Sequence, residues 1–202
     1  MCRVPRVRTT ETADRIRAVA VELIGEKGVA QASLREIAER AGISKPALYY
    51  HFASREELVR SLVQPLVDDV EDVLDTLEAG GSTGDPETIL GAYFDVTYRH
   101  RAITRMVMQD PSILAHLDLA AAVSAWRQRL TRLLVGPKPA LAEQARAVVA
   151  IGGLSDCTAM FVDAPADALR RAVLDAACAT LGAPAKAATR RAASSRARSG
   201  VR

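Results

Sequence analysis

Residues 33–52 read SLREIAERAGISKPALYYHF and predict two short helices joined by a tight turn. Ser33 can cap the first helix by accepting from its free amides, while Glu36 reaches back to complete a capping box. Gly42 supplies the positive φ that turns the chain, and Ser44 can cap the second helix. Two capped helices around such a glycine indicate a helix-turn-helix.

The second of these helices divides into an apolar face and a polar, aromatic face. Leu48 and Phe52 are four residues apart and are expected to anchor it inward. Pro46 is tolerated in the first turn, where no helical hydrogen bond is lost. The outward and flanking faces then carry Lys45, Ala47, Tyr49, Tyr50 and His51. Phenol and imidazole groups can donate to phosphates, and small apolar groups can approach a thymine methyl, so this surface favours DNA.

The pattern S-L-R-E-I-A-x-x-A-G-I-S-x-x-x-L-Y-Y-H-F, after a capped helix and before S-R-E-E-L, resembles the DNA-binding domain of the TetR family of bacterial transcriptional regulators. The resemblance covers roughly residues 10–62, and in that family the second helix is the recognition helix. It implies DNA-facing positions at Ser44, Lys45, Pro46, Ala47, Tyr49, Tyr50 and His51, with flanking phosphate contacts from Ser33, Arg35 and Arg55. Many members have Gly or Thr at the place of Pro46, which has no backbone N–H to offer.

Helical periodicity and the positions of Pro and Gly predict an all-α chain, with a three-helix head joined by a long helix to a helical body. The body is the expected ligand-binding and dimerisation domain. The expected parts are a basic N-terminal arm (1–9), the DNA-binding head (10–53), a connecting helix (54–79), the body (80–182) and a basic disordered tail (183–202). Body helices are expected near 86–102, 103–109, 111–135, 139–162 and 166–181. Thr10 is the expected cap of the first helix, and Pro65 predicts a kink or break near residues 61–65.

Charge is distributed unevenly along the chain. The net charge of +3 divides into +3 for residues 1–60, −6 for 61–181 and +6 for 182–202. A basic head and an acidic body suit a protein whose head meets phosphates. The arm that carries Arg3, Arg6 and Arg8 can lie along DNA or remain solvated, and the tail reads as disordered or as a weak DNA arm.

Composition argues against several other classes of protein. No apolar run approaches the roughly 18 residues of a membrane span, and the start lacks a secretion signal, so the expected location is the cytoplasm. Cys2, Cys157 and Cys178 are odd in number and lack C-x-x-C spacing, which favours free thiols, with a redox sensor at Cys157 or Cys178 as the alternative.

The three histidines give no catalytic or metal motif. His51, His100 and His116 form no paired ligand spacing, and no nucleophile elbow or phosphate-binding Gly loop occurs. No catalytic residue, metal or cofactor is therefore expected. A small helical enzyme that uses His100 or His116 with a carboxylate is the remote alternative.

A candidate effector pocket in the body rests on Tyr93, Thr97 and His100, which share one helix face. Apolar wall and polar tips could be added to them by Met106, Met108, Gln109, Trp126 and Met160. The competing interpretation is that this stripe is ordinary core. Only five aromatic residues follow residue 60, which favours an aliphatic or mixed small molecule over a flat polycyclic one.

The last two long helices are rich in Ala, Val, Leu and Gly, and the resemblance implies a homodimer through this pair. A dimer with two heads would reach successive major grooves about 34 Å apart and read a palindromic operator in double-stranded DNA. The expected function is a repressor that leaves this operator when a small molecule binds the body. The alternatives are an activator, or an architectural DNA-binding protein without an inducer.

Overall fold

The computed structural model describes residues 6–81 and 84–182. In that part of the chain every regular element is an α-helix, as the sequence predicts. The helices are α1 (Arg6–Lys27), α2 (Leu34–Arg40), α3 (Lys45–His51), α4 (Arg55–Ala79), α5 (Pro86–Arg99), α6 (Arg101–Gln109), α7 (Ser112–His116), α8 (Ala120–Val135), α9 (Leu141–Met160) and α10 (Ala166–Thr180).

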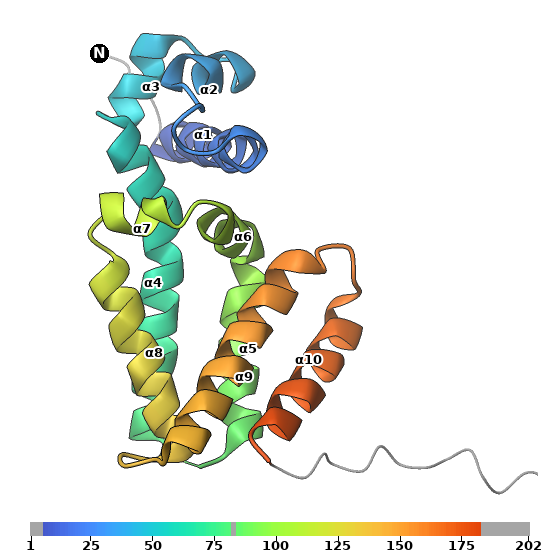
Figure 1. Ribbon diagram of the computed structural model, residues 1–202. Helices are drawn as coiled ribbons and strands as arrows, with labels where there is room; N and C mark the ends of the chain where they lie inside the picture. The colour runs from blue at the N-terminus through green and yellow to red at the C-terminus, as the bar shows by residue number, and fades with distance from the viewer. Residues whose placement is uncertain (1–5, 82–83, 183–202) are drawn as a thin grey trace, which may run out of the picture.

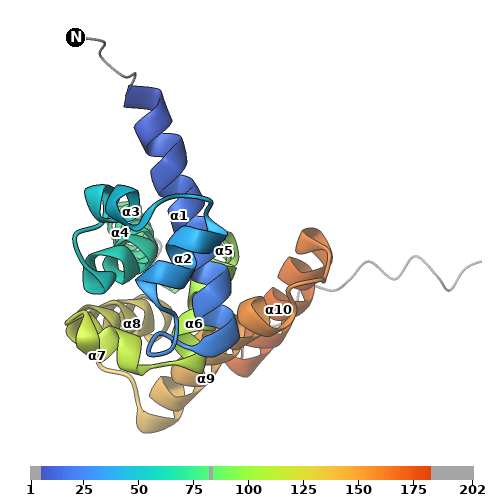
Figure 2. The ribbon, with the colours of Figure 1, turned by 90° about the horizontal axis from the view of Figure 1, so that it is seen from above.

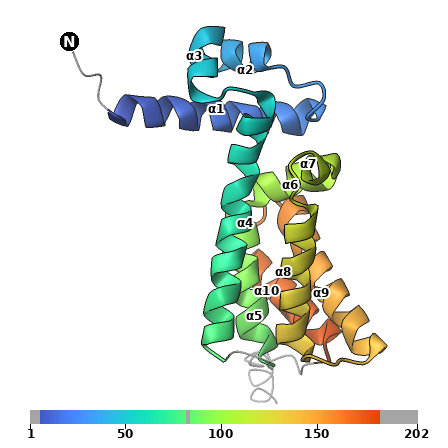
Figure 3. The same ribbon diagram turned by 90° about the vertical axis from the view of Figure 1, so that its left-hand side faces the viewer.

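The helices form a head and a body that share α4. Helices α1 to α3 form the head, and α1 lies across the top of α4 (Figure 3). Helix α4 runs from the head down the body beside α5 and α8, while α9 and α10 lie side by side at the other edge (Figure 1). Seen from above, α2 and α3 lie over the same end of the molecule as α1 (Figure 2).

The predicted caps at Ser33 of α2 and Ser44 of α3 are confirmed. The hydroxyl groups of Ser33, Ser44 and Ser54 accept from main-chain amides three residues on, at 3.1, 3.3 and 3.0 Å. The capping box at Ser33 is only half formed, because the Glu36 carboxylate pairs with Lys27 of α1. A cap bond offers the carboxylate one amide, whereas Lys27 offers a full positive charge that also joins α2 to α1.

Two predicted helix boundaries in the chain are wrong. Helix α1 begins at Arg6, not at Thr10, so part of the expected 1–9 arm is helical. Residues 6–9 contain neither Pro nor Gly, the two residues that most disfavour a helix, so the helix can begin before Thr10. The expected helix 111–135 is two helices, because Asp118 has a φ of 55° and the turn around it separates α7 from α8.

The long helix α4 is unbroken across Pro65, so the expected break is absent and Arg55–Ala79 form one helix. Pro65 is exposed, while Leu62, Val63, Leu66 and Val67 around it are buried. Burial of these four side chains holds both halves of the helix against the same core and offsets the lost backbone bond.

One apolar core runs from the head into the body. Its head portion includes Ile16, Leu23, Ile37 and Leu48, and the buried face of α4 continues it downward as Leu58, Val59, Leu62, Val63, Leu66, Val67, Val70, Leu74 and Leu77. Helix α4 therefore belongs to the packing of both the head and the body. None of the described helices is long and apolar enough to cross a bilayer.

Several sequence-based expectations fall outside the described residues. They are the role of Arg3 in the N-terminal arm, the thiol of Cys2 and the basic tail 183–202. Cys157 and Cys178 are both half-buried, and neither forms a disulfide within the described residues. Burial raises the pKa of the Cys157 thiol, which keeps it protonated and lowers its reactivity toward oxidants.

Candidate nucleic-acid interface and body cavity

The recognition helix candidate, α3, is held against the head by its apolar face. Leu48 is 0% exposed and Phe52, which ends the helix, is also buried. They join Ile37 and Ala38 of α2 in the same core. Because these side chains fix the rotation of α3 about its axis, the opposite face must point to solvent.

That opposite face carries the residues predicted to meet DNA. Tyr50 is 78% exposed and Tyr49 is 43% exposed. Ser44, Lys45 and Pro46 are exposed, whereas Ala47 and His51 are half-buried. The structure therefore gathers all seven positions at one end of the head, around a helix that projects outward (Figures 1 and 3).

Ring contacts order the aromatic part of this surface. The Lys45 ammonium lies 5.8 Å from the centroid of the Tyr49 ring, and the Tyr50 and His51 rings meet edge to face at 5.3 Å. Such contacts hold side chains with little loss of accessibility. They leave a cation and two phenol hydroxyls at the surface, the groups that donate to phosphate oxygens.

The three flanking positions have different local roles. Ser33 is half-buried as the cap of α2, and Arg35 is exposed in an i,i+4 ion pair with Glu39 at 2.8 Å. Arg55 donates through Nη1 to the carbonyl oxygens of Val29 and Ala30, at 3.2 Å each. An exposed pair is weak enough for Arg35 to exchange Glu39 for a phosphate. Arg55, in contrast, fastens α4 to the loop between α1 and α2.

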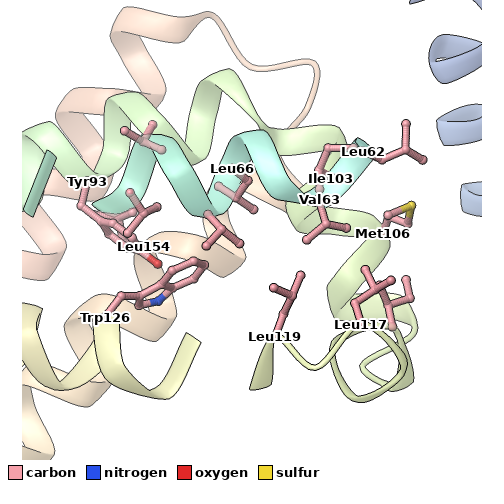
Figure 4. Close-up of a cluster of buried hydrophobic side chains, with 14 of the residues drawn as sticks. Leu62, Val63, Leu66, Tyr93, Ile103, Met106, Leu117, Leu119, Trp126 and Leu154 are labelled. Atoms are coloured by element: carbon pink, nitrogen blue, oxygen red, sulfur yellow. The ribbon is translucent and has the colours of Figure 1, made fainter. Parts of the chain in front are cut away.

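The body contains a cavity of about 580 Å³, within the usual range for ligand sites. Its wall comes from α4 to α9, with Leu66, Tyr93 and Trp126 among its residues (Figure 4). Four of the predicted pocket residues line it: Tyr93, Thr97, Met108 and Trp126. The sequence missed the α4 contribution of Val63, Leu66, Val67 and Val70, because an apolar stripe looks the same whether it meets core or cavity.

The structure does not bring the other four predicted pocket residues, His100, Met106, Gln109 and Met160, to this cavity. The His100 Nε2 lies 2.8 Å from the Asp69 carboxylate, which Arg99 also contacts at 2.6 Å. The His100 hydrogen bond lowers the pKa of Asp69 and joins α5 to α4. This partner turns the ring away from Tyr93 and Thr97.

Met106, Gln109 and Met160 lie elsewhere because of their positions on their helices. Met106 and Gln109 line a separate hollow of about 570 Å³ between α6 and α1. Met160 is the last residue of α9 and is 70% exposed. Helix α6 instead presents Thr104, Val107 and Met108 to the body cavity, since residues three and four apart share a face.

Tyr93 and Ser155 provide the main polar contact in the cavity wall. The Tyr93 hydroxyl lies 3.0 Å from the Ser155 Oγ, and Ser155 also donates to the Ile151 carbonyl at 3.1 Å. Thr97 donates to the carbonyls of Tyr93 and Phe94. Burial raises the pKa of Tyr93, so the phenol stays neutral. The described residues show no group of three or more His, Cys, Asp or Glu side chains that could hold a metal ion.

The outer face of α9 is apolar and uncovered. Val149 is 60% exposed, and Val148, Met160 and Phe161 are also exposed. Gly152 and Gly153 have open space where a side chain would stand. The exposed residues of the neighbouring α10 include Ala168, Ala172, Ala176 and Ala179. Large uncovered surfaces of this kind are typical of protein interfaces.

Comparison with known proteins identifies the head. Residues 16–62 match the family model described as bacterial regulatory proteins, tetR family. The chain is similar to the HTH-type transcriptional regulator EthR of Mycobacterium tuberculosis, with 30% identity over 94 residues, 45% of this chain and 44% of that protein. It is 40% identical over 65 residues to the HTH-type transcriptional activator FasR of Mycolicibacterium smegmatis, over 32% of this chain and 30% of that protein.

The match extends further in structure than in sequence. The chain spans less than half the length of those two curated relatives. A transcriptional regulator of Aquifex aeolicus VF5 has a TM-score of 0.63 and 23% identity, over 82% of this chain and 96% of that one. The fold is that of helix-turn-helix regulators with a helical body. The match to the tetR family covers residues 16–62, which form most of the head and the start of α4.

Proposed function

We propose that this chain is a sequence-specific DNA-binding transcriptional regulator, a homodimer that leaves a palindromic operator when a small molecule occupies the body cavity. The outward face of α3 carries the proposal, because Leu48 and Phe52 fix the helix so that Lys45, Tyr49 and Tyr50 project from the head. We assign base and phosphate contacts to the seven α3 positions, and backbone contacts to Ser33, Arg35 and Arg55. A DNA-binding role places its action in the cytoplasm.

The uncovered face of α9 and α10 supports a homodimer. Val148, Val149, Met160 and Phe161 expose apolar surface to water, and a second copy would bury it. The small residues of both helices would allow close approach of the two chains. A two-fold axis there would present two α3 helices to successive major grooves about 34 Å apart, which requires inverted half-sites.

The position of α4 supports release by a ligand. Its residues Val63, Leu66, Val67 and Val70 line the cavity, and its first turns pack into the head through Leu58. A ligand that fits the cavity better in one position of α4 shifts the equilibrium toward that position. The same shift changes the separation of the heads, so ligand affinity and DNA affinity are coupled.

Specific observations bear on two alternatives, a transcriptional activator and an enzyme. FasR is a transcriptional activator, so activation through the same DNA contacts is the second candidate. For the enzyme alternative, His100 does contact a carboxylate, that of Asp69, but neither residue lines the body cavity. The curated relatives are named as transcriptional regulators.

Selection of bound duplexes from random DNA tests the proposed function. At about 150 mM salt, where non-specific phosphate binding is suppressed, we expect the purified protein to enrich a palindrome. Binding without enrichment would favour the architectural alternative, and no binding would contradict the assignment of α3. The enriched duplex then serves as the operator probe in the experiments below.

Tyr50→Phe is expected to weaken binding to that operator by about 5- to 30-fold. The change removes one exposed hydroxyl that donates to a DNA oxygen, a charge-assisted bond that contributes about 1–2 kcal/mol. Fluorescence anisotropy with labelled operator measures the change in Kd. Tyr98→Phe, the same substitution in the body, is the matched control and should leave Kd unchanged. Equal affinity of the Tyr50→Phe and Tyr98→Phe variants would contradict the contact.

A further inference from the structure

The hydrogen atoms of the three buried cavity hydroxyls, those of Tyr93, Thr97 and Ser155, can be assigned from their contacts. Ser155 donates to the Ile151 carbonyl, so the Tyr93 hydroxyl is the donor in its 3.0 Å contact with Ser155. The Thr97 hydroxyl donates to main-chain carbonyls of its own helix. All three hydroxyl hydrogens are therefore used, and these residues can offer a ligand only lone pairs.

Trp126 is the exception among the buried polar groups of the wall. Its Nε1 is the one buried side-chain nitrogen or oxygen in the described part of the chain that lacks a hydrogen-bond partner. The residue is more than nine-tenths buried and lines the cavity. In Figure 4 the indole nitrogen and the Tyr93 hydroxyl lie at the same end of the cluster, while Val63, Leu66 and Leu119 extend apolar surface away from them.

An indole N–H is a donor only, so its complement is an acceptor. Buried donors are nearly always paired, so a donor without a partner in a cavity wall points to an acceptor on a bound ligand. The indole nitrogen is closed to solvent here. A ligand atom reaches it after a rotation of side chains, an adjustment that is common at binding sites.

The rest of the wall disfavours a charged ligand. Most of the lining is aliphatic, and the charged residues are Arg127 and Asp156, which are both exposed and opposite in sign. Neither a carboxylate nor an ammonium group would find an unopposed buried counter-charge, and an unpaired buried charge is costly. Uncharged oxygen acceptors avoid that cost.

We propose that the cavity takes an uncharged, mainly aliphatic ligand whose carbonyl or hydroxyl oxygen accepts a hydrogen bond from Trp126 Nε1. This proposal rests on the proposed function in one respect, namely that the ligand acts as the effector that releases DNA. Trp126 is then the residue that determines specificity, because it selects for an oxygen acceptor at one end of an apolar molecule. A hydroxyl ligand can in addition donate to the lone pairs of Tyr93 Oη.

A pair of isosteric probes isolates the hydrogen bond. 2-Octanone carries the acceptor, and in 2-methyl-1-octene a methylene group replaces the carbonyl oxygen. Titration calorimetry with wild type and Trp126→Phe is expected to show affinity for 2-octanone falling by about 5- to 10-fold, with little change for the alkene. Trp126 is the only tryptophan, so its emission should also shift on addition of the ketone to wild type.

The controls separate chemistry from shape. Val123→Ala trims the same wall without removing a polar group and should weaken both probes by a similar factor. Equal losses for both probes in Trp126→Phe would overturn the proposal, as would tighter binding of octanoate or octylammonium than of 2-octanone. Failure of the wild type to bind either isosteric probe would also overturn the proposal.

Operator binding in the same samples keeps the two proposals distinct. Wild type that binds the selected operator but not 2-octanone would contradict the ligand class and leave the DNA-binding function standing. Wild type that shows the expected probe pattern without binding any duplex would contradict the proposed function and support the cavity chemistry. Release of the operator by 2-octanone, reduced in Trp126→Phe, supports both.

Discussion

Replacing Leu48 with alanine is expected to lower the free energy of unfolding of the head by about 2–5 kcal/mol. Leu48 is 0% exposed and sits where α3 packs on α2. Truncation removes buried apolar surface and leaves a space that the short helices of the head can fill only in part. Because a domain is stable by only about 5–15 kcal/mol, operator binding should fall as the population of folded heads falls.

Denaturant unfolding followed by circular dichroism measures the loss. Tyr50→Ala is the matched control on the same helix, since its side chain is 78% exposed and its removal should change stability by no more than about 0.5 kcal/mol. We therefore expect Leu48→Ala to lose stability and binding together, and Tyr50→Ala to lose binding alone. A Leu48→Ala variant as stable as Tyr50→Ala would show that Leu48 does not anchor α3.

Val149→Glu is expected to convert the proposed dimer into monomers and to weaken binding to the full palindrome by about 100-fold or more. Val149 is 60% exposed, so a glutamate there is tolerated in a single folded chain. In the dimer it would bury a charge without a partner, which costs several kcal/mol. Two heads that are no longer linked also lose the gain of about 10²–10⁴ that joint binding provides.

Sedimentation and operator anisotropy, measured on the same preparation, check this prediction. Ala125→Glu introduces the same charge at an exposed position of α8, outside the α9–α10 face, and should remain dimeric with unchanged affinity. A Val149→Glu variant that stays dimeric would place the interface elsewhere. A monomer that keeps full affinity would show that one head is sufficient for recognition.

Features that depend on neighbours in sequence were predictable without a structure. The hydroxyl groups of Ser33, Ser44 and Ser54 accept from amides three residues on, because a cap is a contact within one helical turn. The spacing of Leu48 and Phe52 fixed which face of α3 is buried and hence which residues are outward. The head could therefore be recognised from about fifty residues.

Local patterns were less reliable where a tertiary contact competes with them. The Glu36 carboxylate pairs with Lys27 of another helix, so only the Ser33 half of the predicted capping box forms. Burial of Leu62 and Leu66 against the core carries α4 through Pro65 as one helix. In each case a contact between distant residues outweighs a local preference, that of Glu36 for the cap or that of Pro65 for a helix break.

The sequence by itself determined the all-helical class, the helix-turn-helix and the outward face of α3, since helical periodicity and caps are encoded within a few residues. Only the tertiary structure decided the composition of the body cavity. Tyr93 and Trp126 meet α4 residues across the bundle, while Asp69 holds His100 away. A cavity wall is assembled from several helices, so its members are set by helix packing, which no pattern along one helix specifies.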